Sequence, residues 1–278
     1  RDVAVTGVQT CALPIFRRSW LGYIQHPDPD AMNFRLCRKT WDETAMGRLP
    51  LGNLTPAECR TVAVTSFVTG SMVAMGDPMT DLPEERLIQL SKVIPSVNAS
   101  SVQANPFHLA DEAECFITSF GGKNGWNILS AVNLEDHEVS LEFSLGGEYT
   151  AGFGRVEKFL IFDLADWKYV GCFGKDETVK CPPLAPHSSG VLKILPLPPE
   201  GIPFFVACDI HYSSGSREVA IKTKEAGRIV FTIASRWRVP VQIAAGIRRG
   251  NECLVREKSC VLEGSPQKIE FDFKDISS

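Results

Sequence analysis

The hydrophobic period of the chain changes near residue 99, from helical spacing to short alternating runs. Before that point, apolar residues recur every three or four positions between residues that start or stop helices. After it, runs of β-branched and aromatic residues alternate with glycine and proline turns, which is typical of antiparallel sandwiches. The sequence therefore predicts an α/β segment followed by an all-β region.

A capping box marks the start of the first predicted helix. Thr55 and Glu58 have the required spacing, and a proline occupies the first helical position. Small and apolar residues then recur at helical spacing from Cys59 to Phe67, and Gly70 ends the helix. We expect the face that carries them to pack on a sheet.

A buried parallel strand is predicted next, over residues 72–75, because this short apolar run has the length of such a strand. Asp77 follows it, and Asp81 is expected to cap a second helix that Pro95 stops. Helix, strand, acidic turn and helix form the rhythm of a barrel or an open parallel sheet. Functional groups of such sheets lie at the C-terminal ends of the strands, where Asp77 falls. Alternatively, Asp77 only caps the turn that follows it.

An acidic turn, His26-Pro27-Asp28-Pro29-Asp30, precedes these elements. Each proline forces extended geometry on the residue before it, so Asp28 and Asp30 are presented from a stiff segment. Two carboxylates and a histidine could bind sugar hydroxyls, hold a metal ion or transfer protons. Alternatively, the two aspartates only cap a helix over residues 31–39.

The region after residue 99 contains the predicted strands of the sandwich. A proline-rich stretch, residues 197–201, separates them into two groups. They cover residues 114–120, 126–134, 139–145, 158–164, 191–195, 204–210, 218–223, 228–233, 239–245 and 269–273. We expect either one large sandwich or two small ones.

Composition excludes some functions. A net charge of −4 without clustered basic residues gives no footprint for nucleic acid, and no segment has the length of a membrane-spanning helix. The nine cysteines form no CxxC pair and lie in apolar runs, so we expect buried free thiols. Free thiols favour a reducing compartment such as the cytoplasm. No phosphate-binding or metal-protease motif is present, and no cofactor or metal ion is expected.

Residues 20–98 resemble the end of the barrel of family-36-type glycoside hydrolases, the melibiase or α-galactosidase group, which is related to family 27. Four segments carry the resemblance, and residues 184–192 also resemble the closing strand of that group. The four are residues 20–30, 54–60, 70–77 and 82–95. The resemblance implies the C-terminal remnant of a (β/α)8 TIM barrel followed by an antiparallel β-sandwich region.

The resemblance also implies the chemistry of a retaining glycosidase of terminal α-galactosides. Such enzymes use a carboxylate nucleophile and a carboxylic acid/base about 5–5.5 Å apart. In the family both lie upstream of the acidic turn, where this chain carries only Asp2. No catalytic residue is therefore expected in this chain, whereas Asp30, with Asp28 and Asp77, is expected to bind substrate. The methionine that follows the second aspartate in family 27 is Ala31 here, which leaves the sugar open.

The expected domains follow from these patterns. Residues 1–15 resemble the translation of a sequencing-library adapter and are expected to be an artefactual leader. The barrel remnant covers 16–98, a sandwich covers 99–197, and a further β-rich region covers 198–278. A carbohydrate substrate is expected for the parent enzyme, and an oligomer of that enzyme is left open.

Two other functions compete with this interpretation. A carbohydrate-binding or interaction sandwich would present tryptophan or tyrosine side chains in a row on one sheet face, for which Trp126, Trp167 and Trp237 are the candidates. A metallohydrolase would use His26 with the three aspartates named above, but no second histidine lies near them in the sequence.

Overall fold

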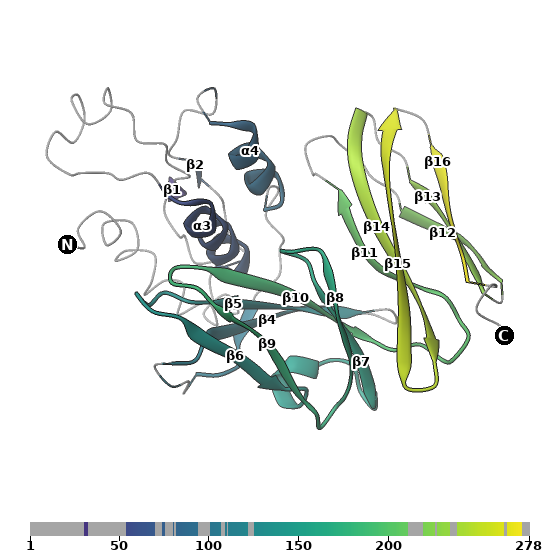
Figure 1. Ribbon diagram of the computed structural model, residues 1–278, viewed down its shortest axis with the longest axis horizontal. Coiled ribbons are helices and arrows are strands. Elements are labelled where there is room, and N and C mark those ends of the chain that lie inside the picture. Colours follow the sequence, from purple (N-terminus) through teal and green to yellow (C-terminus); the bar gives the residue numbers. More distant parts are fainter. Residues whose placement is uncertain are drawn as a thin grey trace, which may run out of the picture. The chain divides into compact units, whose positions relative to one another are not determined.

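A computed structural model of the chain describes residues 31–32, 54–69, 74–75, 80, 82–93, 101–106, 109, 111–121, 125–210, 219–225, 227–233, 238–263 and 266–273. Strands predominate over helices in these residues (Figure 1). Two compact units interleave along the chain. The first contains residues 1–120, 128–143 and 180–191, and the second contains residues 121–127, 144–179 and 192–278. No helix in the described part of the chain is long and apolar enough to span a membrane.

The first unit contains both α-helices. Helix α3 (Pro56–Thr69) begins and ends where the sequence predicts. Helix α4 (Glu84–Ser91) begins later than predicted, with Pro83 at its N-cap position and no side-chain cap. Pro83 thus occupies the N-cap position for which Asp81 was predicted, and Asp81 itself lies outside the described residues.

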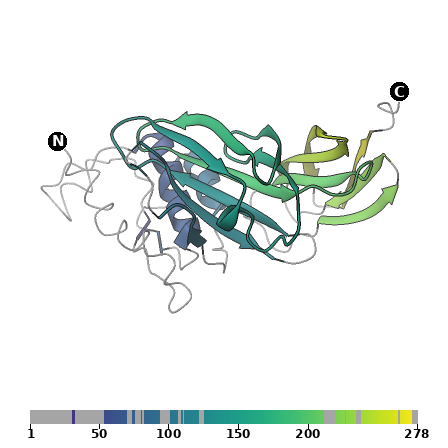
Figure 2. The ribbon, with the colours of Figure 1, turned by 90° about the horizontal axis from the view of Figure 1, so that it is seen from below.

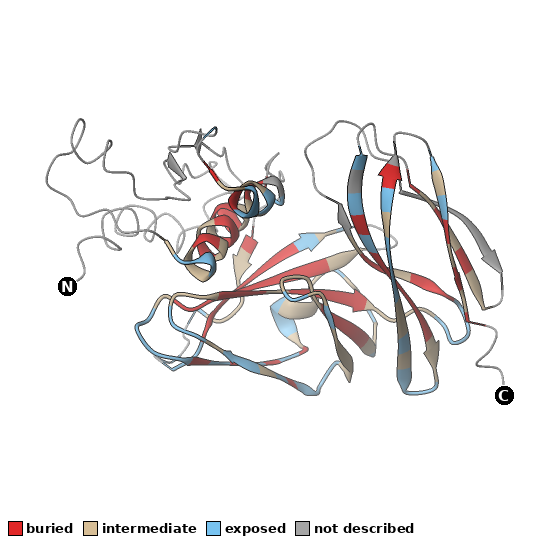
Figure 3. Ribbon diagram, turned by 45° about the horizontal axis from the view of Figure 1, so that its top comes forward, coloured by how far each residue is buried: buried red, intermediate tan, exposed pale blue. Residues whose placement is uncertain are grey.

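Helix α3 buries more than the single face predicted from its sequence. One face packs on α4 through a cluster that includes Cys59, Ala63 and Leu90. Val64 and Val68 pack instead against Phe116 and Val132 of the neighbouring strands β4 (Glu114–Phe120) and β5 (Trp126–Val132). The two ribbon views agree on this neighbourhood (Figures 1 and 2), and Figure 3 shows buried residues along most of α3.

The strands that follow α4 in the first unit belong to two sheets. β3 (Ser101–Gln103) pairs antiparallel with β4, and the order continues through β5 to β10 (Ser189–Pro196). β6 (Val139–Ser144) forms a two-stranded sheet with β9 (Thr178–Leu184). Along β6, buried and exposed residues alternate strictly, so one face of that pair is solvated.

In the second unit, β10 pairs antiparallel with β7 (Lys158–Asp163), and β7 pairs antiparallel with β8 (Lys168–Gly174). A 3-10 helix, η3 (Gly147–Thr150), precedes β7. The register of β7 with β8 shifts between Ile161 and Phe162, which marks a bulge in β8.

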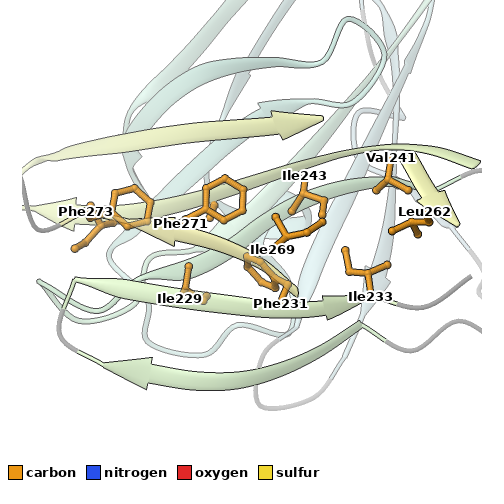
Figure 4. Packing of buried hydrophobic residues seen from close by; sticks show 11 residues of the cluster. Ile229, Phe231, Ile233, Val241, Ile243, Leu262, Ile269, Phe271 and Phe273 are labelled. Carbon is orange, nitrogen blue, oxygen red and sulfur yellow. The ribbon is translucent and has the colours of Figure 1, made fainter. Parts of the chain in front are cut away.

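Two three-stranded antiparallel sheets form the sandwich of the second unit. One has the order β11-β14-β15, with β11 Phe204–Ile210, β14 Arg238–Arg249 and β15 Glu252–Glu263. The other has the order β12-β13-β16, with β12 Val219–Glu225, β13 Arg228–Ile233 and β16 Gln267–Asp272. Apolar side chains of β13, β14, β15 and β16 meet between the sheets (Figure 4).

The opposite face of β11 and β14 is also buried. Phe204, Val206 and Ala244 pack there against Leu160 and Phe162 of β7. Gly246 of β14 lies on this side, where a Cβ atom would approach Phe204 Cζ to 2.9 Å. The sheet β11-β14-β15 is therefore the central layer of its unit.

The strands confirm the predicted antiparallel β-rich region, although β3, β8, β9 and β15 are additional to the predicted set. The β/α barrel and the domain limits at residues 15, 98 and 197 stay predictions.

The prediction of buried cysteines is wrong in part. Cys59 and Cys115 are buried, but the other described cysteines are only half-buried, because most lie on strands with partly exposed faces. These are Cys172, Cys181, Cys208, Cys253 and Cys260.

Candidate functional site

The predicted substrate-binding residues Asp28, Asp30 and Asp77 lie outside the described residues, as does His26. The structure therefore neither brings them together nor separates them. The described elements that flank them are the strands β1 (Ala31–Met32) and β2 (Ala74–Met75).

β1 and β2 pair in parallel, with Ala31 opposite Ala74 and Met32 opposite Met75. The helix predicted over residues 31–39 is therefore wrong at its start, because Ala31 and Met32 extend into a ladder with β2. The interpretation in which the acidic turn caps a helix beginning at Ala31 fails with it. In the sequence, β1 follows Asp30 directly.

Helix α3 lies between the two parallel strands in the sequence. Parallel neighbours need a crossover, which a helix commonly provides. The predicted capping box is present at its start: the Thr55 amide donates to Glu58 Oε2 at 2.6 Å, and the Glu58 amide donates to Thr55 Oγ1 at 3.2 Å. These bonds satisfy two backbone donors at the N-terminus and fix where α3 begins.

Helix α4 is tied to the same end of α3 by Arg86. Its Nη2 donates to the carbonyl oxygen of Leu54 at 2.5 Å, and its Nη1 donates to that of Thr55 at 3.5 Å. Desolvation lowers the pKa of Arg86, and the negative charge of Glu58 opposes this effect. The guanidinium thus binds carbonyl groups just before the helix while it lies near the acidic side chain of the capping box.

A second contact anchors α3 to the strand region of the first unit. The Thr61 hydroxyl, which is buried, lies 3.0 Å from the carbonyl oxygen of His187 and 3.1 Å from that of Ala57. His187 Nε2 lies 2.9 Å from Asp136 Oδ1, and His187 has a positive φ of 54°. Sequence reasoning found no role for this histidine, because its partners are distant in the chain.

Asn133 holds the loops beside this contact. Its buried side-chain amide donates to the carbonyl oxygens of His137, Leu184 and Ala185 at 2.8, 3.0 and 2.8 Å. Its Oδ1 accepts from the Glu135 amide at 2.9 Å. The two N–H donors of the amide group serve three carbonyl oxygens, so one of these hydrogen bonds is shared, and the asparagine determines the loop geometry.

Lys193 is the most unusual ionisable residue that the sequence analysis did not single out. It lies in β10, is 5% exposed, and directs Nζ to the carbonyl oxygen of Val206 at 2.7 Å. The rings of Trp126 and Phe205 lie 4.6 and 4.8 Å from Nζ. Desolvation lowers the pKa of Lys193 to about 7, with an opposing effect from Cys208. A single lysine inside the apolar run of residues 191–195 was the available signal.

The described residues contain no group of three or more histidine, cysteine or acidic side chains that could hold a metal ion. The histidine and the aspartates that a metallohydrolase would use lie outside the described residues. Trp126 and Trp167 pack at the edge of the core around β7 and β11, so neither is part of an exposed aromatic row. Trp237 lies outside the described residues.

Comparison with models of known families gives no match, and comparison with curated proteins gives none either. Among solved structures, a family-27 β-L-arabinopyranosidase from Geobacillus stearothermophilus is similar at 16% identity, over 66% of this chain and 43% of that chain, with a TM-score of 0.49. A candidate α-N-acetylgalactosaminidase from Bacillus halodurans is 22% identical over 54% of this chain and 34% of its own length, with a TM-score of 0.43.

The α-galactosidase I of Mortierella vinacea is 16% identical over 53% of this chain and 37% of its own length, with a TM-score of 0.39. This chain thus spans well under half of each of these three proteins. The family-27 enzyme and the α-galactosidase belong to the groups named by the sequence resemblance.

Proposed function

We propose that this chain is the C-terminal part of a retaining glycoside hydrolase that acts on terminal α-galactosides or related α-glycosides. Its role is to complete the sugar-binding end of a (β/α)8 barrel and to pack a β-sandwich region against it. The two catalytic carboxylates lie upstream, so the chain does not hydrolyse glycosides by itself.

One observation supports this proposal: β1 and β2 pair in parallel, and α3 lies between them in the sequence. A strand, a helix and a parallel strand are the repeating unit of a barrel. The unit begins directly after the acidic turn and is followed by α4 and then by antiparallel strands. That order agrees with the segments that carry the resemblance to α-galactosidases.

The proposed site consists of the acidic turn and Asp77, the second residue after β2. Asp30 is proposed to accept hydrogen bonds from sugar hydroxyls, and Asp28 and Asp77 to support it. Carboxylates suit this role because each ionised group accepts several hydrogen bonds. The capping box, Arg86 and Thr61 serve as the scaffold, since they fix the start of α3 and hold this helix to α4 and to the backbone at His187.

The upstream reading frame tests the proposal. Sequencing the source DNA ahead of the Phe16 codon is expected to reveal further strand–helix units with two carboxylates at strand ends. In the extended enzyme, Asp30→Asn is expected to raise KM for an aryl α-galactoside more than it lowers kcat. A start codon just upstream of Phe16, with no such units, would overturn the proposal.

A panel of three aryl glycosides tests which substrate the extended enzyme prefers: an α-galactoside, an α-N-acetylgalactosaminide and a β-L-arabinopyranoside. The extended enzyme is expected to prefer one of them, with the product released first in the anomeric configuration of the substrate. Proton NMR during the first turnovers reads this configuration directly. Inversion would contradict the proposed mechanism while leaving the glycosidase assignment intact.

A further inference from the structure

The sandwich of the second unit has two edge strands that face each other, β15 in one sheet and β16 in the other. Among the described residues, β15 pairs only with β14, and β16 pairs only with β13. A strand with a partner on one side leaves every second N–H and C=O unpaired, and another molecule can add a strand there. Both edges are therefore open to association unless side chains close them.

Two core-facing positions of β15 carry a cation. Arg256 lies opposite Ala245 and Lys258 lies opposite Ile243 in the β14–β15 ladder, and opposite residues point to the same face. Ala245 and Ile243 belong to the core between the two sheets. Leu262, further along the same face of β15, is buried in that core. The two cations thus interrupt an otherwise apolar face, and inward-pointing charges are one means of protecting an edge strand.

Both cations reach across to the backbone of β16. Lys258 Nζ donates to the carbonyl oxygen of Glu270, and Arg256 Nη1 donates to the carbonyl oxygen of Asp272. Moving two residues back along β15 therefore moves the contact two residues forward along β16. The side chains connect the two sheets in the way that a backbone ladder connects two strands.

The two carbonyl groups of these contacts lie on the free edge of β16. The Phe273 amide donates to the carbonyl oxygen of Gly227, directly before β13, at 2.6 Å. The backbone of Phe273 therefore faces β13. Because backbone groups alternate in direction along a strand, those of Glu270 and Asp272 face away from β13. A strand added at this edge would need the same two carbonyl oxygens as acceptors.

Each cation also covers an aromatic ring of the core. Lys258 Nζ lies 5.4 Å from the centroid of the Phe271 ring, and Arg256 Cζ lies 5.4 Å from that of Phe273. Both rings are buried, and Figure 4 shows them between the sheets. A cation over a ring face is attracted by the ring. These contacts hold the two side chains where they occupy the free edge.

A third contact runs in the opposite direction, from β16 to β15. Gln267 Nε2 donates to the carbonyl oxygen of Val261 at 3.2 Å. Val261 lies opposite Pro240 of β14, which has no N–H to offer to this carbonyl group. As β15 runs back from Val261 toward Arg256, β16 runs forward from Gln267, so the three contacts share one antiparallel register. We name the three donor side chains, Arg256, Lys258 and Gln267, the edge seam.

We propose that the edge seam prevents two copies of this chain from associating through their β16 strands. In such a dimer, N–H groups of the second β16 would bond to the carbonyl oxygens that Arg256 and Lys258 occupy in the single chain. The seam is thus an autoinhibitory contact against strand addition. The proposal concerns the sandwich alone and is independent of the proposed glycosidase function.

The partner that the seam excludes is a second copy because β16 is complementary to itself. Identical edges pair about a twofold axis, and β16 strands that pair antiparallel around Glu270 place Lys268 of each copy opposite Asp272 of the other. Opposite charges in such positions favour pairing. Glu270 itself keeps an ion pair with Arg228 at 2.5 Å, which offsets the repulsion between the two central carboxylates. Without the seam, this edge therefore has both free acceptors and matching charges.

The test removes the donors of the seam and keeps the apolar stems. Arg256→Met/Lys258→Met in the full chain is compared with the wild type and with Lys92→Met/Lys175→Met, which removes two exposed lysines from turns. Sedimentation velocity over a concentration series measures self-association. We expect the dissociation constant of the seam variant to be lower by at least about tenfold, because each freed carbonyl group can accept a strand hydrogen bond. A seam variant that associates no more than the control would overturn the proposal.

Hydrogen exchange shows where the copies meet. In the seam variant, the amides of Lys268, Glu270 and Asp272 should exchange more slowly as the protein concentration rises, because the second copy accepts their hydrogen bonds. The wild type and the control should show no such change over residues 267–273. Association of the seam variant without this protection would also overturn the proposal, since the contact would then lie elsewhere.

A single substitution decides the question if the double variant does not fold. Lys258 is exposed, so Lys258→Met is expected to keep the fold and to show the same protection of residues 267–273 at higher concentrations. Lys258→Arg keeps a donor at this position and should behave like the wild type. Equal self-association of Lys258→Met and Lys258→Arg would contradict the role of the seam.

Discussion

Lys193 Nζ donates to the carbonyl oxygen of Val206 at 2.7 Å, and Val206 is the extra residue of a bulge in β11. A bulge leaves its extra residue outside the regular ladder, so its carbonyl group needs another partner. Lys193 supplies that partner from β10, between the rings of Trp126 and Phe205. A buried ammonium group thus joins two strands of the second unit.

Lys193 is expected to make stability depend on pH. Its pKa is lowered to about 7 in the folded protein and is near 10.4 in an unfolded chain, so unfolding takes up a proton between these values. Stability should therefore fall as pH drops through this window, by at most about 1.4 kcal/mol per pH unit. Urea unfolding of the wild type and Lys193→Met across this range isolates the contribution.

The control for this experiment is Lys180→Met, which removes an exposed lysine paired with Glu142. It should leave the pH dependence of the wild type unchanged. Equal slopes for the wild type and Lys193→Met would show that the ammonium group is not desolvated as the structure indicates.

Removal of the capping box should weaken α3. Thr55→Ala deletes the side-chain oxygen that accepts from the Glu58 amide, at a cost of about 1 kcal/mol. Thr55→Ser keeps the oxygen and should cost much less. Urea midpoints of the two variants provide the measurement, and equal losses would mean that the hydroxyl is not the capping group.

Asn133→Asp should be among the most damaging isosteric changes in the first unit. The new carboxylate would face the carbonyl oxygens of His137, Leu184 and Ala185 without a proton to donate, so we expect a loss of more than about 3 kcal/mol near neutral pH. Asn251→Asp is the matched control, because Asn251 is exposed and accepts from Lys158. A thermal shift of similar size in both would contradict the inferred role of Asn133.

Gly246→Ala should disturb the central layer of the second unit. A Cβ atom there would lie 2.9 Å from Phe204 Cζ and 3.2 Å from Val206 Cγ2, and both side chains are buried. We expect a loss of about 1–3 kcal/mol from overpacking. At Gly146 nothing lies within 4 Å of such an atom, so Gly146→Ala should leave the unfolding midpoint nearly unchanged.

Local signals in the sequence were sufficient where one short segment determines an element. The capping box predicted the start of α3, and the runs at 114–120, 204–210 and 228–233 gave the bounds of β4, β11 and β13. In each case a hydrophobic run ends at a turn signal, so the pattern and the hydrogen-bonded ladder agree.

Elements that depend on distant partners could not be predicted in this way. β15 carries charged residues through most of its length and lacks a clean alternation, yet it pairs with β14 along all twelve of its residues. β9 contains Pro182 and Pro183, which argue against a strand. However, β9 pairs with β6 in a two-stranded sheet, and such an edge strand tolerates proline. Thr61 with His187, and Lys193 with Val206, are likewise long-range pairs without a sequence motif.

The candidate site was predictable only as far as the family resemblance reached. The acidic turn and Asp77 were singled out from the residues themselves, and their substrate-binding role was implied by that resemblance and stays a prediction. The parallel pairing of β1 with β2 corrects the helix expected after Asp30. The acidic turn alone could not distinguish a helix cap from the residue before a strand, because an aspartate can directly precede either kind of element.

The most direct test of the proposed function compares two proteins on an aryl α-galactoside: this chain alone, and the same chain extended upstream through the proposed strand–helix units. The account predicts turnover by the extended protein, loss of that turnover when either upstream strand-end carboxylate is replaced by its amide, and no turnover by this chain. Turnover by residues 16–278 alone, or an extended protein that is folded but inactive on all three glycosides, would contradict it.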